Sequence, residues 1–370
     1  MDKDNLLILG NGTISLYKFR KELMAAVAEY SNVYVSAPDD GFADEIKSTG
    51  AHYINTYVDR RKANPFSDII LLLRYILLIR RVKPKVILTY TVKPNIYGNF
   101  AARLLKVPVI STVSGLGDGF LNPGMVGKIV RILFTLAFKS VGTIVMQNPA
   151  DEAAMVAAGI ITNQRIIHVP GSGVNLKEHK VLDFPNPKDA DNNHISFLYI
   201  GRIMHSKGIG ELIKAGRRLK NDTAYSFDIN LAGFEEADAK DLIKQAEADN
   251  IVSSLGFQKD ISPALEEAHC VVLPSYSEGM SNALLEAAAS GRGLIASDIS
   301  GCREIVDHGV NGFLCKPKDE ESLYHCMKDF LDTTAEAQKQ MGKASRDKVV
   351  KQFDRDIVTN TMIEEILRYK

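Results

Sequence analysis

Short apolar segments alternate with segments of helical character along this 370-residue chain, and they do so in two separate series. The first series predicts strands at residues 6–9, 32–36, 86–90, 109–113 and 143–147. The second predicts strands at residues 195–199, 227–232, 253–256, 271–274 and 293–297. Buried parallel strands appear as continuous apolar runs that helices must connect. The alternation therefore predicts an α/β fold with two doubly wound parallel sheets.

A polar segment at residues 171–193 separates the two series. It contains Pro185, Pro187 and a run rich in Asp and Asn at residues 189–193, a composition typical of linkers. We therefore expect one Rossmann-like domain over residues 1–172 and a second over residues 190–352. A chain of this length can give each domain a full hydrophobic core.

Charge and cysteine usage exclude several classes of protein. Lys plus Arg equals Asp plus Glu at 45 each, so the chain has no overall basic field to attract nucleic acid. The four cysteines lack metal-site spacing and the histidines are scattered, so we expect neither a metal nor a disulfide framework. The apolar stretch at residues 6–9 is too short for a signal peptide, which predicts a cytoplasmic protein.

The segment most informative about function lies where a predicted strand meets a predicted helix. The apolar run 270–274 ends at a proline, and residues 283–289 have strong helix propensity. Ser281 or Asn282 is the natural N-cap, and Gly279 leaves room for a ligand to approach the backbone. The free N–H groups of the first helical turn suit a phosphate.

Two glutamates bracket this junction. Glu278 lies in the loop, and Glu286 lies four residues after Asn282 on the same helix face. A carboxylate beyond a phosphate site suits a diol such as a ribose, and one in the loop meets whatever is attached to the far end of a diphosphate. The pattern predicts a nucleotide-sugar site, although two glutamates at this spacing also occur on solvated helices.

Two cations follow an earlier predicted strand at residues 195–200. Gly201 and Arg202 end that strand, and Lys207 and Gly208 precede the next predicted helix. Ligands of open α/β sheets bind at the carboxyl ends of strands, so Arg202 and Lys207 are placed to stabilise the charge of a departing diphosphate. The alternative is a solvated basic loop.

Together these segments resemble the signature of glycosyltransferase family 4, retaining enzymes of GT-B fold that transfer a sugar from a nucleotide donor. The resemblance covers nearly the whole chain. It implies two Rossmann-like domains facing a cleft, a last helix at residues 353–370 that crosses back to the first domain, a UDP-sugar donor, and no metal or other cofactor. It also implies that Glu278, Arg202 and Lys207 are catalytic and that the donor contacts Gly12, Gly201, Phe257, Gly279, Met280, Ser281, Asn282 and Glu286.

Further segments of the second half match the same family. Residues 256–260 correspond to the segment whose backbone receives the nucleobase, with burial in the core as the alternative for Phe257. Residues 301–306 and 311–314 match as structural features, which we interpret as a turn before a helix and a tight hairpin turn.

In the first domain, Gly10, Asn11, Gly12 and Thr13 follow the first predicted strand, where glycines permit close approach of a ligand. They fail the dinucleotide fingerprint because Ser15 occupies the third glycine position, which argues against an NAD enzyme.

Residues 89–98 and 111–117 follow later strands and resemble a subgroup of the family that extends undecaprenyl-diphosphate-linked sugars, including bacterial N-acetylgalactosaminyltransferases. Many family members have His-Gly where this chain has Ser114 and Gly115, so a hydroxyl replaces an imidazole. Thr89, Lys93 and Asn95 are equally suited to capping the next helix. The resemblance implies acceptor contacts at Asn11, Thr13, Thr89, Lys93, Ser114 and Gly115.

A lipid-linked acceptor requires a protein surface that meets the membrane. Residues 65–82 are apolar on nearly every helical face, and residues 126–138 are similar. The first segment is too short, and too interrupted by Arg74, to span a bilayer. It either packs against the sheet, which is the favoured interpretation, or lies at the cytoplasmic membrane surface as a peripheral attachment. The basic residues around it are Arg60, Arg61, Lys62, Arg74, Arg80 and Arg81.

The sequence thus predicts a retaining transferase that moves a hexose or N-acetylhexosamine from a UDP-sugar to a polyprenyl-diphosphate-linked sugar during surface polysaccharide or glycoconjugate assembly. Transfer can proceed through a covalent intermediate or by front-face attack, and the second suits a site whose groups surround a diphosphate. The alternatives are a UDP-sugar 2-epimerase of GT-B-like fold and a non-enzymatic sugar- or nucleotide-binding protein.

Overall fold

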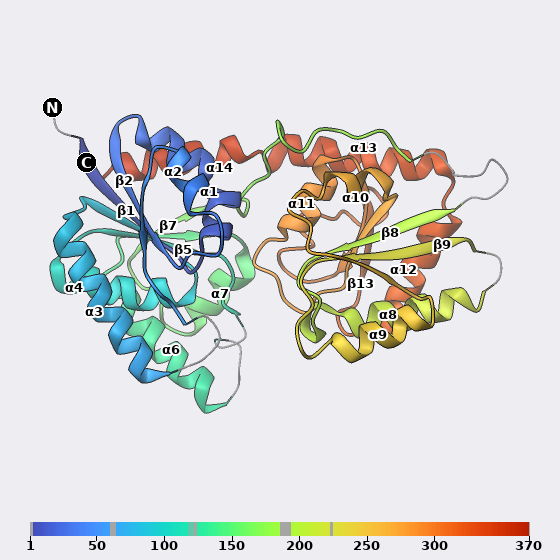
Figure 1. Cartoon of the computed structure of the whole chain (residues 1–370), viewed down its shortest axis with the longest axis horizontal. Helices are drawn as coiled ribbons and strands as arrows, with labels where there is room; N and C mark the ends of the chain where they lie inside the picture. The colour runs from blue at the N-terminus through green and yellow to red at the C-terminus, as the bar shows by residue number, and fades with distance from the viewer. Residues whose placement is uncertain are drawn as a thin grey trace. The chain divides into compact units, whose positions relative to one another are not determined.

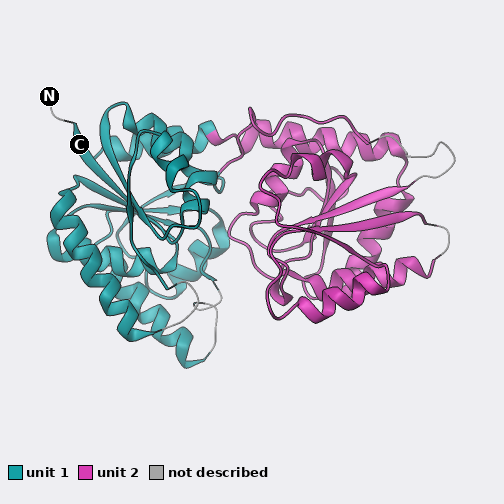
Figure 2. Cartoon of the chain, in the orientation of Figure 1, with its two compact units in different colours: residues 1–172, 356–370 teal, residues 173–355 magenta. Residues whose placement is uncertain are grey.

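The computed structural model describes residues 3–59, 64–117, 120, 124–185, 194–222 and 225–369. The chain divides into two compact units, the first formed by Met1–Ser172 with Asp356–Lys370 and the second by Gly173–Arg355 (Figure 2). Each unit is a parallel β-sheet with helices on both faces (Figure 1). The predicted α/β class with two parallel sheets is confirmed.

The first sheet has seven strands, and the chain connections diverge from β1. β1 pairs in parallel with β2 on one side and with β4 on the other, which makes the carboxyl end of β1 a switch point of the topology. The strand order is β3 (His52–Asn55), β2 (Ser31–Ala37), β1 (Asp4–Leu9), β4 (Val86–Tyr90), β5 (Val109–Val113), β6 (Thr143–Met146) and β7 (Arg165–His168).

Helices cover both faces of this sheet (Figure 1). One face shares a hydrophobic core with α1 (Thr13–Ala28), α2 (Ala43–Ser48) and α14 (Arg355–Leu367). The other carries α3 (Pro65–Val82), the π-helical turn η1 (Pro94–Gly98), α4 (Asn99–Leu105), α6 (Met125–Phe138) and α7 (Pro149–Ala157). α3 and α7 begin in the same way, because an asparagine at the N-cap accepts a backbone N–H and a proline follows it.

The second sheet has six strands, and β8 takes the place that β1 has in the first. β8 pairs in parallel with β9 and with β11. The strand order is β10 (Ser253–Gly256), β9 (Phe227–Ala232), β8 (Ile195–Ile200), β11 (Cys270–Leu273), β12 (Gly293–Ser297) and β13 (Gly312–Cys315). The helices are η2 (His205–Lys207), α8 (Ile209–Lys220), α9 (Lys240–Ala248), α10 (Ser262–Glu267), α11 (Asn282–Ala289), α12 (Glu320–Asp332) and α13 (Ala335–Gln352).

Three strands lie outside the sequence-based expectation, and all three are sheet edges. β3, β7 and β13 each have a hydrogen-bonded neighbour on one side only, so they lack the long apolar run of a central strand. The expected hairpin turn at residues 311–314 is wrong, because Gly312–Cys315 is a strand that runs parallel to β12. The turn at residues 301–306 leads toward that strand and not into a helix.

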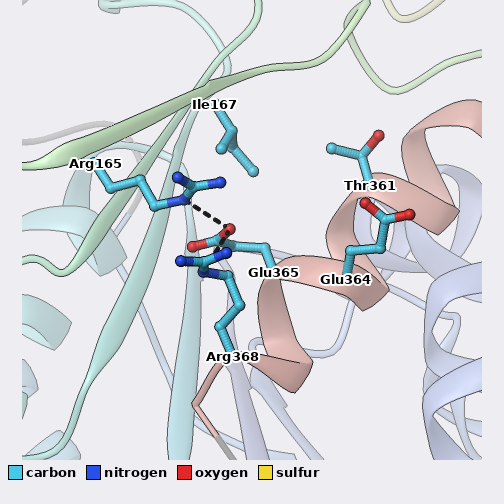
Figure 3. Close-up of a pocket in the computed structure, with 6 residues that line it drawn as sticks. All are labelled: Arg165, Ile167, Thr361, Glu364, Glu365 and Arg368. Carbon is cyan, nitrogen blue, oxygen red and sulfur yellow. Dashed lines mark hydrogen bonds and ion pairs between the residues drawn. The ribbon is translucent and has the colours of Figure 1, made fainter.

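The last helix, α14, packs on the first unit. Val358 and Ile366 are buried in the core that α1 and β1 share. The Glu365 side chain is only 4% exposed, and its carboxylate accepts from Arg165 at 3.0 Å and from Thr143 at 2.5 Å. These partners compensate the burial of the charge, so they fix the position of α14 on β6 and β7. Figure 3 shows Glu365 and Arg165 at a pocket lined by Arg165, Ile167, Thr361, Glu364, Glu365 and Arg368.

Part of the segment expected to be a linker is held on the second unit. The Arg355 N–H donates to the Val174 carbonyl at 3.0 Å, and a Cβ atom on Gly173 would lie 2.6 Å from the Arg355 Cα. The buried Arg292 guanidinium donates to the Asp183 carbonyl at 2.8 Å. Residues 186–193 of that segment lie outside the described residues, as do Arg60, Arg61 and Lys62.

Candidate active site

The glutamate junction and the two cations lie on neighbouring strands of the second sheet. Residues 277–286 follow β11, whereas Arg202 and Lys207 follow β8. These two strands pair in parallel, with Phe197 opposite Cys270, so their carboxyl ends share one edge of the sheet. The edge is also the switch point of this sheet, where ligands of open α/β folds bind.

Two glycines allow the loops at this edge to touch. Gly208 has φ +74°, and a Cβ atom there would lie 2.0 Å from the Pro274 carbonyl oxygen. Gly233 follows β9, and a Cβ atom there would lie 1.7 Å from the Gly201 carbonyl oxygen. No side chain fits at either position, so the loops after β8, β9 and β11 are brought together through bare backbone.

Lys207 and Glu278 form an ion pair at this edge. Lys207 Nζ lies 2.6 Å from Glu278 Oε1, and the two side chains are only 18% and 16% exposed. Lys207 Nζ also lies 3.5 Å from the Ser277 carbonyl oxygen. An ammonium has three N–H donors, so Lys207 can bind a phosphate oxygen while it keeps Glu278 as a partner. The pair ties the loop after β8 to the loop after β11.

Arg202 is more open to solvent than Lys207. Its side chain is 60% exposed, and its guanidinium lies 3.9 Å from the Glu236 carboxylate in the loop after β9. The Tyr199 hydroxyl donates to the Arg202 carbonyl at 2.7 Å, which fixes the backbone of the turn. Burial, together with the charge of Glu278, raises the pKa of Tyr199, so the phenol remains a donor at neutral pH.

α11 begins with Ser281 as its N-cap and Asn282 as its first residue. The Ser281 hydroxyl accepts the Leu284 N–H at 3.3 Å, and the Ser281 N–H donates to the Gly301 carbonyl at 3.0 Å. A Cβ atom on Gly301, which has φ +86°, would lie 2.6 Å from the Gly279 carbonyl oxygen. The turn after β12 therefore packs against the backbone of the glycine-containing loop and supports it, a role that the sequence pattern does not reveal.

Other predicted donor contacts lie along the same elements. Met280 is buried beneath the loop, at 8% exposed. Glu286 lies one turn into α11 and is half-buried. Phe257 follows β10 and stacks on Phe234, with ring centroids 4.2 Å apart and residue exposures of 41% and 56%. The core alternative for Phe257 is therefore wrong, and this exposed aromatic pair offers a flat surface that suits a planar base.

Tyr276 is a residue of this edge that sequence reasoning missed. Its N–H donates to the Ser206 carbonyl at 3.0 Å, and its hydroxyl donates to Glu211 at 2.7 Å. Burial, followed by the contact with Glu211, raises the pKa of Tyr276 to about 12. The His205 ring meets it edge-on, and the His205 N–H donates to Asp238. The only available signal was its position between β11 and the glutamate junction.

In the first unit, Thr13 has a structural role at the start of α1. It is fully buried, its hydroxyl donates to the Asp40 carboxylate, and it accepts the Asp40 N–H at 3.1 Å. Asp40 also accepts the Ile14 N–H at 2.7 Å, because the N-cap residue Gly12 has no side chain to do so. Asn11 precedes this cap and is half-buried.

Thr89 and Lys93 are also engaged within the first unit. Thr89 is fully buried, with its hydroxyl 2.9 Å from that of Ser111. Lys93 Nζ lies 2.7 Å from Asp68 of α3, and these side chains are 16% and 12% exposed. Asn95 donates to a backbone carbonyl of β5 at 2.9 Å. The alternative that these residues cap the next helix is wrong, since η1 has no side-chain cap.

Ser114 and Gly115 follow β5 at the carboxyl edge of the first sheet. Ser114 is exposed, and Gly115 has φ +110°, a conformation that favours glycine. Of the predicted acceptor contacts, Ser114, Gly115, Asn11 and part of Lys93 keep access to solvent, whereas Thr13 and Thr89 are fully buried. Contact of these residues with an acceptor stays a prediction.

In the part of the chain that the structure describes, no group of three or more His, Cys, Asp or Glu side chains is arranged to hold a metal ion. The four cysteines are buried as free thiols. Within the same residue ranges, no helix is both long and apolar enough to cross a bilayer.

Comparison with known proteins identifies the class of enzyme to which this chain belongs. A model of glycosyl transferases group 1 matches residues 182–348, and a glycosyl transferase 4-like model matches residues 6–148. HepE of Anabaena, solved with UDP and glucose, superposes with a TM-score of 0.78 at 18% identity, over 99% of this chain and 100% of that one. Sucrose-phosphate synthase from Thermosynechococcus elongatus superposes with a TM-score of 0.80 at 16% identity, over 99% of both chains. The chain is a glycosyltransferase of GT-B fold.

Two relatives narrow the class. The N,N'-diacetylbacillosaminyl-diphospho-undecaprenol alpha-1,3-N-acetylgalactosaminyltransferase of Campylobacter jejuni is 26% identical over 85% of this chain and 86% of its own length. The UDP-Gal:alpha-D-GlcNAc-diphosphoundecaprenol alpha-1,3-galactosyltransferase of Escherichia coli is 25% identical over 75% of this chain and 73% of its own length. The chain belongs to the family 4 glycosyltransferases and is related to transferases of lipid-linked sugars.

Proposed function

We propose that this glycosyltransferase moves a hexose or N-acetylhexosamine from a UDP-sugar to a polyprenyl-diphosphate-linked sugar, with retention of configuration and without a metal ion. The transfer extends a lipid-linked glycan for surface polysaccharide or glycoconjugate assembly. Both relatives carry diphospho-undecaprenol in their names, and one names UDP-Gal. The acceptor supports a place of action at the cytoplasmic membrane surface, with the protein attached peripherally.

One observation carries the donor part of this proposal. Lys207 and Glu278 meet at the carboxyl ends of β8 and β11, beside the capped N-terminus of α11. Lys207, Arg202 and the first-turn N–H groups of α11 supply positive charge for a diphosphate. Glu278 then lies beside the sugar that the diphosphate carries. Glu286, farther along α11, suits the hydroxyls of the ribose.

These groups favour front-face attack over a covalent intermediate. In that scheme the bond from the anomeric carbon to the diphosphate oxygen breaks, and the acceptor hydroxyl oxygen forms the new bond on the same face. The hydroxyl proton passes to the departing diphosphate oxygen. Lys207 and Arg202 stabilise the charge that develops on this leaving group, and Glu278 orients the donor sugar through its hydroxyls.

Calorimetric titration with UDP tests the ribose assignment. We expect Glu286→Ala to weaken UDP binding roughly tenfold to a hundredfold, since hydrogen bonds to a charged group contribute about 1.5–3 kcal/mol. Glu336→Ala, an exposed glutamate of α13, is the matched control and should leave the affinity unchanged. Unchanged affinity in Glu286→Ala would refute the assignment.

Incubation with a UDP-N-acetylhexosamine alone distinguishes transfer from epimerisation. A transferase leaves the donor intact until a polyprenyl-diphosphate sugar is added, and then releases UDP together with an extended lipid. Formation of a 2-epimer, or of free UDP at a comparable rate, in the absence of acceptor would support the epimerase instead.

A further inference from the structure

α3 is apolar on both of its sides. Its inner side packs on the first sheet through buried side chains, namely Leu71, Tyr75, Leu78, Ile79 and Val82. Its outer side is apolar as well, yet it is open to solvent: Phe66 is 80%, Ile69 59%, Ile70 44%, Leu73 54% and Leu77 64% exposed. Covering the sheet requires the inner side only. The outer stripe therefore has no role in the packing of the first unit.

Neighbouring helices continue this apolar surface. α4 contacts α3 and also contacts α6, and the three cover the same face of the sheet (Figure 1). Leu104 of α4 is 63% exposed, and α6 exposes Met125, Val126, Ile129, Ile132 and Leu136. Of the 22 large apolar residues that are exposed in the described part of the chain, 11 lie on these three helices. We name the exposed side chains of α3, α4 and α6 the α3–α6 face.

The charges of the α3–α6 face have a single sign. Its exposed basic residues are Arg74, Arg80, Arg81, Arg103 and Lys128. The three helices contain one acid, Asp68, which is buried and paired with Lys93 at 2.7 Å. Acids and bases are equal in number over the whole chain, so this is a local segregation of charge. Apolar side chains among cations match the acyl boundary and the anionic headgroups of a bilayer.

We infer that the α3–α6 face docks on an anionic lipid bilayer. This inference rests on the proposed function only because a lipid-linked acceptor resides in a membrane. The rival occupant is a second copy of this chain. Two such faces in contact would bring like charges together without an acid to neutralise them, which is unfavourable across an interface. The charge pattern thus favours the bilayer over self-association.

Vesicle sedimentation of the full chain tests the inference. We expect binding to phosphatidylglycerol-containing vesicles, weaker binding to pure phosphatidylcholine, and a loss of binding at high salt. The double variant Leu73→Asp/Ile129→Asp should lower partitioning at least about tenfold. Arg80→Gln, which removes one cation, should lower vesicle partitioning about fivefold. Ile357→Asp on α14, at 41% exposed on the opposite face of the same sheet, is the matched control and should bind as the parent does.

A site-specific reporter is available because the chain contains no tryptophan. Phe66→Trp places the only indole on the α3–α6 face, and Ile357→Trp places it on α14. We expect anionic vesicles to shift the emission of the first variant to shorter wavelength and to leave the second unchanged. Equal shifts in both variants, or none in either, would overturn the assignment of this face.

The outcomes separate this inference from the proposed function. Circular dichroism and urea unfolding show whether each variant is folded, since every change lies in the first unit. If the unsubstituted protein binds no vesicles, the inference is overturned, even if the protein transfers sugar to a detergent-solubilised acceptor. A protein that binds vesicles through this face but transfers no sugar leaves the inference intact and removes the proposed function. A dimer that Leu73→Asp/Ile129→Asp dissociates would assign the face to a second copy and refute lipid docking.

Discussion

The ion pair between Lys207 and Glu278 leads to opposite predictions for its two partners. Glu278 Oε1 lies 2.6 Å from Lys207 Nζ. A phosphate oxygen bound to the same ammonium lies about 4.5 Å from that carboxylate oxygen, because the N–H donors of an ammonium diverge at about the tetrahedral angle. Two unit negative charges at this distance repel by about 3.7 kcal/mol at an effective dielectric constant of 20, and by about 0.9 kcal/mol in bulk water. Because both side chains keep some contact with solvent, we take about 1 kcal/mol.

Glu278→Gln removes this repulsion and preserves the shape of the side chain. We expect UDP to bind about fivefold more tightly, which corresponds to 1 kcal/mol, while turnover with a UDP-sugar falls. Lys207→Met removes the cation that meets the phosphate. Its UDP affinity should fall roughly tenfold to a hundredfold, because a hydrogen bond to a charged group contributes about 1.5–3 kcal/mol. Isothermal titration calorimetry at low and high salt measures both effects.

A second ion pair of the same unit provides the control. Arg217 and Asp249 lie 2.7 Å apart on the surface, with side chains 44% and 39% exposed. Arg217→Met should therefore leave UDP affinity unchanged. If Glu278→Gln weakens UDP binding as much as Lys207→Met does, Glu278 contacts the nucleotide itself and the reasoning fails. If neither variant changes the affinity, the pair does not belong to the donor site.

Three further experiments test the packing. Gly208→Ala places a Cβ atom 2.0 Å from a carbonyl oxygen at φ +74°, and we expect a lower melting temperature, from a cost of about 2 kcal/mol or more. Glu365→Ala should destabilise the first unit toward urea by about 2–3 kcal/mol, whereas the exposed neighbour in Figure 3, Glu364→Ala, should change little. Burial raises the pKa of each of the four cysteine thiols, so a thiol reagent at mildly alkaline pH should label none in the native protein and all in urea.

The sequence predicted every central strand but only one of the four edge strands, β10. β1, β4, β8 and β11 are buried on both faces and therefore carry continuous apolar runs. The edge strands β3 and β7 begin and end with exposed residues, and neither has a fully buried position. Periodicity has little to detect in such a segment, since half of its environment is solvent. β13 was missed for a related reason, because its glycine was taken for a turn residue.

Residues at the carboxyl edge of the second sheet and residues of the first unit likewise differ in how well the sequence predicted their roles. Ser281 could be predicted as an N-cap because capping depends on residues three or four positions apart. Thr13 and Thr89 could not be recognised as interior residues, because their hydroxyl partners, Asp40 and Ser111, lie 27 and 22 positions away in the chain. Tyr276 was missed in the same way, since its partner Glu211 belongs to another loop-helix unit.

Local sequence was enough to establish the α/β class, the order of the main elements and the loops that carry glycine and charge, because periodicity and caps are properties of neighbouring residues. Three-dimensional packing was needed to show that Lys207 pairs with Glu278 and that α3 leaves one apolar side open to solvent. Both features depend on contacts between residues that are remote in the chain. When both sides of a helix are apolar, the pattern cannot tell the side that covers the sheet from the side that remains exposed.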